Sequence, residues 1–341
     1  MKSVFKNNYN RLLLFTLFSF CLSVPSWAQK HRMNKDVSET YPVSSSDALE
    51  LSNRYGNVTI NTWNQRQVAV NVKIEAWGKS EDQVKEILEQ INIRHSKEGN
   101  VVKFHTEIES KSKYLSNNDK RGFEINYTVN MPDDLRLDLS NKYGRINMPD
   151  YKGRLTLYVA YGRVSTGELL GPDNDITVKY SSNSSFKAVM KGDLEIRYSS
   201  GLEIGKAGDI ELSDRYGGVR IGEVEKIDAE IAYSSLKIQT LHKSLNLDAR
   251  YSSGKIEQVK NGFKEIRVDT SYGSFSMDFD DNVNFDFEVN VRYGGFKRNL
   301  SGMELKREYR KNHSAEYAGT KGKSGQAFIK ASASYGSISF Y

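Results

Sequence analysis

The chain has 341 residues, with 49 Lys and Arg against 43 Asp and Glu, so its formal net charge is +6 at pH 7. Charged residues make up 27% of the chain and the mean hydropathy is −0.61, which excludes a bundle of membrane-spanning helices. The charge excess is too small to predict a nucleic-acid-binding protein.

Residues 1–28 have the features of a secretory signal peptide. A basic start precedes the apolar run from Leu12 to Val24, and Ser26 and Ala28 offer small side chains at the cleavage positions. Cys21 is the single cysteine and lies inside this run, so we expect no disulfide and no thiolate site in the mature chain. We therefore predict an exported protein, located in the periplasm or on the outer cell surface.

Residues 29–46 are polar and lack periodicity, which predicts a flexible leader. Residues 47–134 then contain several runs in which apolar and polar side chains alternate, as in half-buried strands. We expect this region to be an N-terminal β-rich cap, because the first coil of a stacked array otherwise exposes its core.

One α-helix is predicted inside the cap, over residues 80–91. Ser80 and Gln83 form a capping-box pair, and the apolar residues that follow fall on one face. Residues 91–108 predict a hairpin in which His95 lies opposite Val102 and His105 opposite Asn92. Residues 111–121 are charged and polar, which is typical of a mobile loop.

From residue 135 onward the chain repeats one unit: a strand, a tyrosine, two small residues and a second short strand. In residues 227–238 (IDAEIAYSSLKI), apolar residues alternate up to Tyr233 and restart at Leu236 with the opposite parity. Successive tyrosines are mostly 17 to 21 residues apart, a period typical of stacked coils. We assign a structural repeat role to Tyr143, Tyr161, Tyr180, Tyr198, Tyr216, Tyr233, Tyr251, Tyr272, Tyr293 and Tyr335.

The predicted fold is therefore all-β: a parallel β-solenoid, or β-helix, of about 18–21 residues per coil over residues 135–341. A basic loop or hairpin near 297–325 should close its far end. The tyrosines have the parity of the inward residues two and four positions before them, which favours stacking at the edge of the core. The alternative is an outward ladder that offers a platform to sugar rings or to a partner.

The residues available for chemistry are few and scattered. None of the five histidines belongs to an HxH or HExxH pair, and the sequence has no GxSxG motif and no P-loop. Asp278, Asp280 and Asp281 cluster, but without the glycine and distal glutamate of a calcium loop. We therefore expect no catalytic, cofactor-binding or metal-binding residues and no cofactor.

A basic run is the remaining surface feature of note. It consists of Lys306, Arg307, Arg310 and Lys311, and is either a solvated hairpin face or a contact for anionic lipid or polysaccharide.

The combination of a signal peptide, a capped β-region with one helix, and Tyr-Gly or Tyr-Ser-Ser coils ending in YGSISFY resembles a known family. It is similar to the exported "putative adhesin" proteins of Gram-negative envelopes, a group of unknown function. The resemblance spans Ala48 to Tyr341. It implies a β-solenoid with a non-enzymatic surface or envelope role, and it supplies no catalytic residues.

We expect a non-enzymatic, adhesin-like scaffold that presents a repetitive β-surface to an envelope protein or a glycan. No nucleic-acid partner and no transmembrane segment in the mature chain are expected. The alternative is a polysaccharide-active β-helix enzyme, a lyase or a hydrolase, which needs acids held across a cleft. The outward acids include Glu211, Asp228 and Glu230, and no pair stands out among them.

Overall fold

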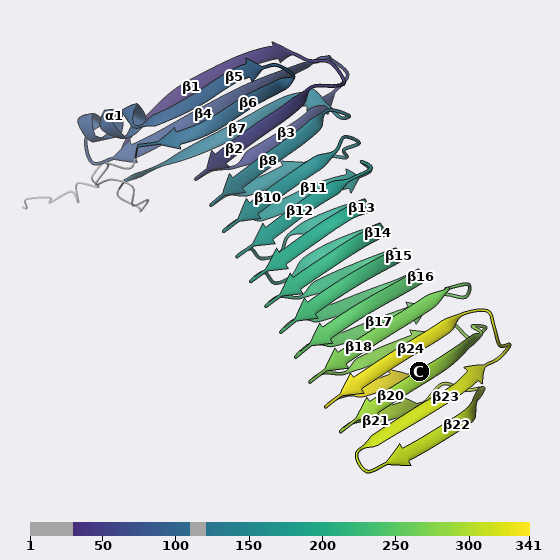
Figure 1. Cartoon of the computed structure of the whole chain (residues 1–341). Coiled ribbons are helices and arrows are strands. Elements are labelled where there is room, and N and C mark those ends of the chain that lie inside the picture. Colours follow the sequence, from purple (N-terminus) through teal and green to yellow (C-terminus); the bar gives the residue numbers. More distant parts are fainter. Residues whose placement is uncertain (1–29, 110–120) are drawn as a thin grey trace, which may run out of the picture.

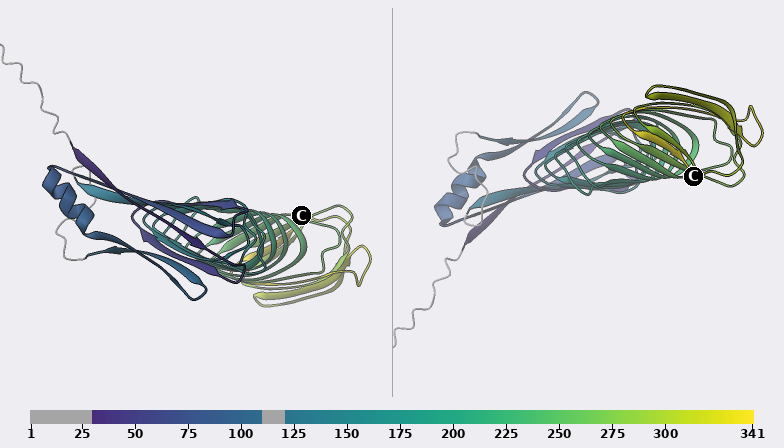
Figure 2. Two further views of the ribbon diagram at one scale, coloured as in Figure 1. Left: turned by 90° about the horizontal axis from the view of Figure 1, so that it is seen from above. Right: turned by 90° about the horizontal axis from the view of Figure 1, so that it is seen from below.

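The computed structural model describes residues 30–109 and 121–341. Figure 1 shows a rod of stacked strands whose N-terminal end carries a broader cap with one helix. Viewed along the rod, the coils appear as flattened loops lying over one another (Figure 2). The signal peptide predicted for residues 1–28 lies outside the described residues, as does nearly all of the loop predicted at 111–121.

Each central coil has one strand before its tyrosine and one after it. The preceding strands hydrogen-bond to one another and form face A, whereas the following strands form face B. The strands are β8 Arg136–Lys142, β9 Arg145–Met148, β10 Leu155–Ala160, β11 Arg163–Leu169, β12 Asn174–Lys179, β13 Ser185–Arg197, β14 Leu202–Arg215, β15 Val219–Ala232, β16 Ser235–Arg250, β17 Ser253–Val259, β18 Glu265–Ser271 and β19 Phe275–Phe279.

Strands β13 to β16 are long because each runs from face B of one coil into face A of the next. The chain bends between the two halves, and neighbouring backbones approach closely there. At Gly208 an added Cβ would lie 2.1 Å from the carbonyl oxygen of Met190, so only glycine fits this bend. These strands leave no loop between consecutive coils on that side of the rod.

The central coils pair in parallel and in register, as the sequence predicts. Ile227 lies opposite Ile210 on one side and Leu245 on the other. Because the pleat repeats every two residues, this register places every apolar row inside. The prediction of parallel coils is thus confirmed for the middle of the rod, whereas antiparallel pairs complete both ends.

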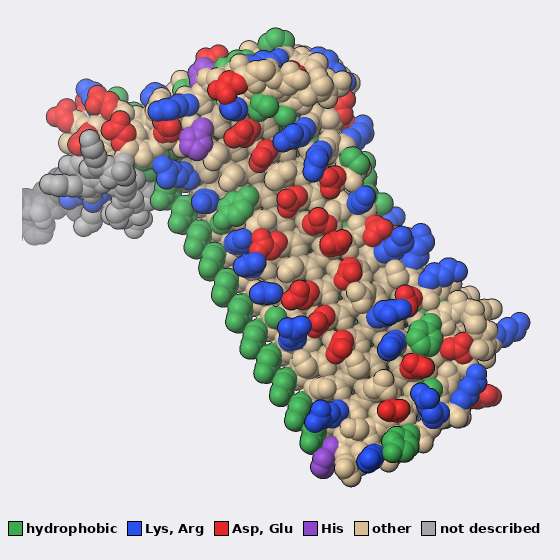
Figure 3. All heavy atoms as spheres, viewed as in Figure 1, with side chains coloured by type: hydrophobic (Ala, Val, Ile, Leu, Met, Phe, Trp, Pro, Cys, Tyr) green, Lys and Arg blue, Asp and Glu red, His purple; other side chains and the backbone are tan. Residues whose placement is uncertain are grey.

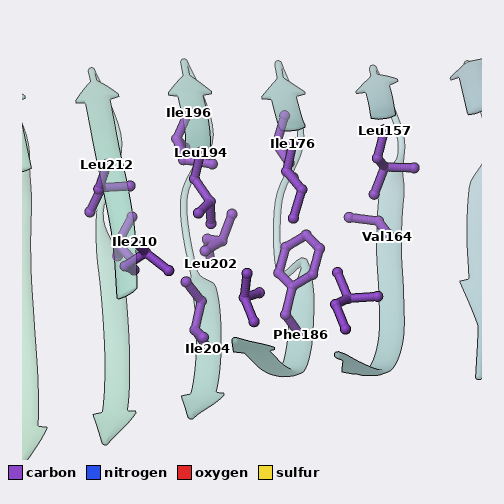
Figure 4. Packing of buried hydrophobic residues seen from close by; sticks show 14 of the residues in the cluster. Leu157, Val164, Ile176, Phe186, Leu194, Ile196, Leu202, Ile204, Ile210 and Leu212 are labelled. Atoms are coloured by element: carbon purple, nitrogen blue, oxygen red, sulfur yellow. The ribbon is translucent and has the colours of Figure 1, made fainter. Parts of the chain in front are cut away.

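The core is a continuous apolar filling between the two faces. Figure 4 shows side chains from successive coils, among them Leu194, Leu202, Ile204 and Phe186, meeting in the space between the strands. Phe186 is 1% exposed and Ile204 is also 1% exposed. Since each coil contributes only part of this filling, burial requires neighbours above and below.

The N-terminal cap extends both faces beyond the first coil, which β2 and β3 form around Tyr55. Strands β6 and β7 add to it in parallel, and β5, β4 and β1 follow in antiparallel pairs. The elements are β1 His31–Pro42, β2 Ala48–Arg54, β3 Val58–Trp63, β4 Gln67–Gly78, α1 Glu81–Glu89, β5 Ile91–Glu98, β6 Val101–Ile108 and β7 Gly122–Pro132.

Helix α1 closes the cap and lies close to the predicted range. Its Ser80 N-cap accepts a hydrogen bond from the Gln83 backbone N–H at 3.3 Å. Val84, Ile87 and Leu88 are buried, and the helix packs on β4, β1 and β5.

The flexible leader predicted for residues 29–46 is wrong for most of its length. Residues 31–42 form β1, which pairs antiparallel with β4 from His31 opposite Gly78 to Pro42 opposite Gln67. No residue of β1 is fully buried, so the strand lacks the apolar alternation by which strands are recognised. Its order comes from backbone pairing with β4 and from Met33, Val37 and Tyr41, which pack against the core while partly buried.

The far end of the rod does not follow chain order. Strands β24 Phe328–Ser334 and β25 Ser337–Phe340 lie between β18–β19 and β20–β21, and pair in parallel with both neighbours. The last stretch of chain therefore forms the penultimate coil, and not the final one. The outer coil consists of β20 Phe285–Arg292 and β21 Gly295–Arg298.

A hairpin occupies the region where the sequence predicts a basic loop or hairpin. It is formed by β22 Met303–Lys311 and β23 Ser314–Lys321, and β23 pairs antiparallel with β20. We call β22 and β23 the terminal hairpin. In Figure 1 it is the outermost part of the rod.

Candidate functional site

The main feature of the surface is a single stack of tyrosine rings along one long edge of the rod. Consecutive ring centroids are 4.7–5.1 Å apart and their planes lie within 9° of parallel. This spacing is that of neighbouring strands. The stack, called here the tyrosine ladder, contains in order Tyr55, Tyr143, Tyr161, Tyr180, Tyr198, Tyr216, Tyr233, Tyr251, Tyr272, Tyr335 and Tyr293.

The backbone places these rings outside the core. Every ladder tyrosine has a positive φ, between 49° and 62°, which is the left-handed conformation. The reversed backbone turns the side chain away from the interior, although its parity matches the buried residues before it. From Tyr143 onward the ladder residues are 44–51% exposed, so the expected position at the core edge is wrong. Figure 3 shows the ladder as a line of hydrophobic side chains along one edge.

A repeated backbone hydrogen bond holds each corner in place. The N–H of Tyr161 donates to the carbonyl of Lys179 at 3.1 Å, and that of Tyr198 to the carbonyl of Arg215 at 2.9 Å. The acceptor is in each case the residue before the tyrosine of the next coil. The left-handed corners are therefore locked to one another, which explains the even spacing of the rings.

The ring faces are covered by neighbouring rings, and both ends of the ladder are closed. Phe123 packs edge-on against Tyr55 at 5.6 Å and 76°. At the other end His313, from the turn of the terminal hairpin, stacks on Tyr293 at 4.8 Å. A ligand therefore meets ring edges and phenol hydroxyls, and not the open ring face that a sugar would stack on.

On face A the ladder is bordered by a row of basic side chains, one residue before the tyrosine. Several of them are paired with acids that stand three residues before the tyrosine of the next coil: Lys179 with Glu195 at 3.1 Å and Arg215 with Glu230 at 3.2 Å. The row consists of Arg54, Lys142, Lys179, Arg197, Arg215, Arg250 and Arg292. This border therefore carries both positive and negative charges.

On face B the ladder is bordered by a shallow groove of about 650 Å³, called here the serine groove. Small residues line its floor, including Ser200, Ser235, Ser253 and Ser274. Arg220, Lys237 and Lys255 occupy one register position on adjacent strands and line the groove as well. The groove thus offers serine hydroxyls, interrupted at Gly218, and three neighbouring cations, with Glu203 in the adjacent register position.

The groove cations have acids on one side. Lys237 pairs with Glu257 at 2.6 Å and Lys255 with Asp278 at 3.1 Å. Asp280, another member of the predicted aspartate cluster, lies 3.6 Å from Lys260. Each of these two aspartates thus has a lysine as its neighbour, and the cluster makes ordinary surface ion pairs.

The histidines are dispersed over the rod. His95 lies opposite Phe104 and His105 opposite Arg94, so the predicted register of the hairpin is wrong by two residues. The chain turns through the two residues Gly99 and Asn100. His95 Nδ1 is 2.8 Å from the Tyr41 hydroxyl. Within residues 30–109 and 121–341, no group of three or more His, Cys, Asp or Glu side chains is placed to hold a metal ion.

One buried carboxyl group was missed by sequence reasoning. Asp214 is 0% exposed, two residues before Tyr216, where most coils carry an apolar residue. Burial raises the pKa of Asp214 to about 6, and the hydrogen bond from Ser234 opposes this shift only in part. The signal was available in the sequence, because an acid at this position breaks the apolar row.

The fold and the tyrosine ladder together define a class of protein, in which stacked parallel β-coils display a regular row of aromatic rings along one edge. The chain belongs to the family described as Toastrack DUF4097, whose model matches residues 46–339. This family membership agrees with the resemblance seen in the sequence. No curated protein matches the chain.

Solved structures with a similar course cover most of the chain at low identity. A "putative adhesin" from Parabacteroides distasonis is 8% identical, with 90% of this chain and 97% of that chain covered and a TM-score of 0.41. A "putative adhesin" from Bacteroides fragilis is 10% identical, with 90% of this chain and 97% of that chain covered and a TM-score of 0.36. A "putative lipid binding protein" from Parabacteroides distasonis is 12% identical, with 90% of this chain and 96% of that chain covered and a TM-score of 0.36.

Among the described residues, no helix has the length and apolar character needed to cross a bilayer.

Proposed function

We propose that the chain is an exported, non-enzymatic scaffold of the adhesin-like kind, which binds an extended glycan along the tyrosine ladder and the serine groove. The observation that supports this proposal is the half-exposed ladder itself. It runs the length of the rod and repeats the same chemical groups once per coil.

Stability alone does not account for tyrosine at these corners. A non-glycine residue in the left-handed conformation costs about 1–2 kcal/mol. Each coil adds one stacking contact, which stabilises by about 0.5–1.5 kcal/mol. These contributions nearly cancel, and glycine would avoid the strain altogether. What the rings add is mainly the surface that they form.

The groups on this edge suit a polymer rich in hydroxyl groups. The ladder supplies a phenol hydroxyl once per coil at the strand spacing, and four coils supply a serine hydroxyl to the groove two residues after the tyrosine. The coil of Tyr216 has Gly218 at that place. A glycan with a regular repeat can make the same weak contact in successive coils. Many weak contacts along one chain produce a high overall affinity without any single strong site.

The placement of the acids supports binding over hydrolysis. Glycosidases hold two carboxyl groups on opposite sides of the scissile bond. Glu211 and Asp228 are register partners on adjacent strands of face A, so they lie side by side on one surface. Glu230, on the same strand as Asp228, is paired with Arg215.

The proposal is tested by screening the chain against a glycan array and measuring affinity for the best glycan. The test variant is Tyr216→Asn with Tyr233→Asn, because asparagine tolerates positive φ. We expect at least a tenfold loss of affinity. Tyr309→Asn is the matched control, since Tyr309 is 53% exposed but lies outside the ladder. Equal affinity of wild type and ladder variant, or cleavage of the glycan, would refute the proposal.

A further inference from the structure

The positive charge of the chain is concentrated at one end of the rod. Residues 297–323 contain eight Lys and Arg against three Asp and Glu, a net charge of +5, whereas the whole chain has +6. The structure places this segment in β21, the terminal hairpin and their connections, at the end opposite α1 (Figure 1). The rod is therefore electrically asymmetric along its length.

Strand β22 has an unusual environment for a strand of nine residues. Eight of its residues are exposed and Met303 is half-buried, so neither of its faces packs on a core. It pairs with β23 alone, which leaves its outer edge without a strand partner among the described residues. A strand of an ordinary antiparallel sheet buries one face. Burial therefore does not explain why β22 is ordered or why it has this sequence.

Several cations of this end lack an acidic partner. Within the described part of the chain, no ion pair joins Lys297, Arg307, Lys311 or Lys323 to an acid. Arg310, by contrast, pairs with Glu308 at 2.7 Å and lies over the Tyr317 ring at 5.8 Å. Uncompensated cations at an exposed end attract an anionic surface over about one Debye length.

An exposed aromatic side chain is interleaved with these cations. Tyr309 is 53% exposed and alternates with Arg307 and Lys311 on one face of β22, whereas Leu305 lies on the opposite face, across from Gly319. Lysine and arginine on an edge strand are enough to prevent edge-to-edge aggregation, so that role does not explain an exposed tyrosine between them. Tyrosine beside Lys and Arg is instead the composition found where a protein meets lipid headgroups.

We infer that the terminal hairpin docks on the surface of an anionic lipid bilayer. Arg307 and Lys311 would contact the headgroup charges, and Tyr309 would enter the interfacial layer between them. Because the hairpin lies at the tip, such docking leaves the tyrosine ladder free along the side of the rod. This inference goes beyond the proposed glycan binding and does not depend on it.

The test is co-sedimentation of the full chain with vesicles of phosphatidylglycerol and phosphatidylcholine, compared with vesicles of phosphatidylcholine alone. We expect binding to the anionic vesicles only, with a partition coefficient that falls as salt is raised. Arg307→Glu with Lys311→Glu should lower that coefficient at least tenfold. Both side chains are exposed, so the variant is expected to fold, which circular dichroism would verify.

The matched control is Arg145→Glu with Arg163→Glu, which makes the same change in net charge at two exposed register partners in the other half of the rod. It should bind the vesicles nearly as wild type does. Equal losses in both variants would mean that only total charge matters, and would overturn the inference. Binding of the wild type to neutral vesicles would also overturn the inference. The same holds if a soluble polyphosphate displaces the protein completely from the vesicles and Tyr309→Ser has no effect on vesicle binding, because the hairpin would then bind phosphate groups and not a lipid surface.

Discussion

The hydroxyl of Ser234 donates a hydrogen bond to Oδ2 of Asp214 and so joins two neighbouring coils inside the rod. The other carboxyl oxygen of Asp214, Oδ1, is buried and has no hydrogen-bond partner in the described part of the chain. At the equivalent corner near the cap, Asn141 donates its side-chain amide to the carbonyl of Gly56 at 3.0 Å. Asp214 thus occupies a corner position, two residues before a ladder tyrosine, at which a neutral asparagine is accommodated in another coil.

Asp214→Asn should stabilise the protein at pH 8 by roughly 3 kcal/mol, because a raised pKa measures the cost of ionising the carboxyl group inside the fold. Burial raises the pKa of Asp214 from its ordinary value of 3.8 to about 6. Below pH 3.8 both the folded and the unfolded chain hold the proton. Between pH 3.8 and 6 only the unfolded chain ionises, so wild-type stability falls as pH rises and then levels off.

The measurement is denaturant unfolding of wild type and variant from pH 4 to pH 8. The gain should vanish at pH 4 and be complete above about pH 7. Asp228→Asn, an exposed position on β15 of face A, controls for the change in net charge. A gain that is the same at every pH would show that ionisation of Asp214 is not its cause.

The ladder corners allow a second prediction, which separates backbone strain from ring stacking. Tyr216 has a φ of 59° and stacks on Tyr198 and Tyr233. Tyr216→Asn loses both contacts but tolerates the left-handed backbone, so we expect a loss within about 1 kcal/mol. Tyr216→Val loses the same contacts and is β-branched, which makes positive φ far less favourable. It should destabilise by about 1–2 kcal/mol more than Tyr216→Asn, measured by denaturant unfolding.

A third prediction follows from the position of the last strands. Residues 327–341 supply β24 and β25, which separate the coil of Tyr272 from the coil of Tyr293. Their removal should leave β18 and β20 without partners on one side and unfold the terminal hairpin region. Hydrogen exchange should then become fast in β20 and β23 and stay slow in β14 and β15. Unchanged protection in β20 would contradict the observed strand order.

The sequence predicts the central coils well because their information is local. In residues 227–238 the alternating apolar residues specify both the strands and the inward face, and repetition at a fixed period specifies the stacking. Parallel in-register pairing, such as Ile227 opposite Ile210, then follows from matching apolar rows.

The remaining features depend on information that is not local. Parity predicts that Tyr233 points inward, but its φ of 52° reverses the side chain. Strand β24 is inserted between β18 and β20. The apolar pattern of β20 and that of β24 fit equally well beside β18, so the sequence does not predict which of them lies there. Strand β1 is ordered by pairing with β4 and by three partly buried side chains, Met33, Val37 and Tyr41, which are four residues apart and so do not form the apolar alternation of a strand. The serine groove arises only when successive coils stack in register and bring their corner residues side by side.

A fourth prediction compares two adjacent glycines at the far end of the ladder. An added Cβ on Gly294 would lie 1.7 Å from the carbonyl oxygen of Gly336, in the inserted coil, whereas one on Gly295 would meet nothing within 4 Å. Backbone cannot move away as a flexible side chain does, so Gly294→Ala should push the two coils apart and destabilise by about 2–3 kcal/mol. Gly295→Ala should change stability by less than about 0.5 kcal/mol. Denaturant unfolding, with hydrogen exchange in β24 to detect local opening, would measure both. Similar effects of the two substitutions would mean that the coils of Tyr293 and Tyr335 are not in close backbone contact, and would place the last strand elsewhere.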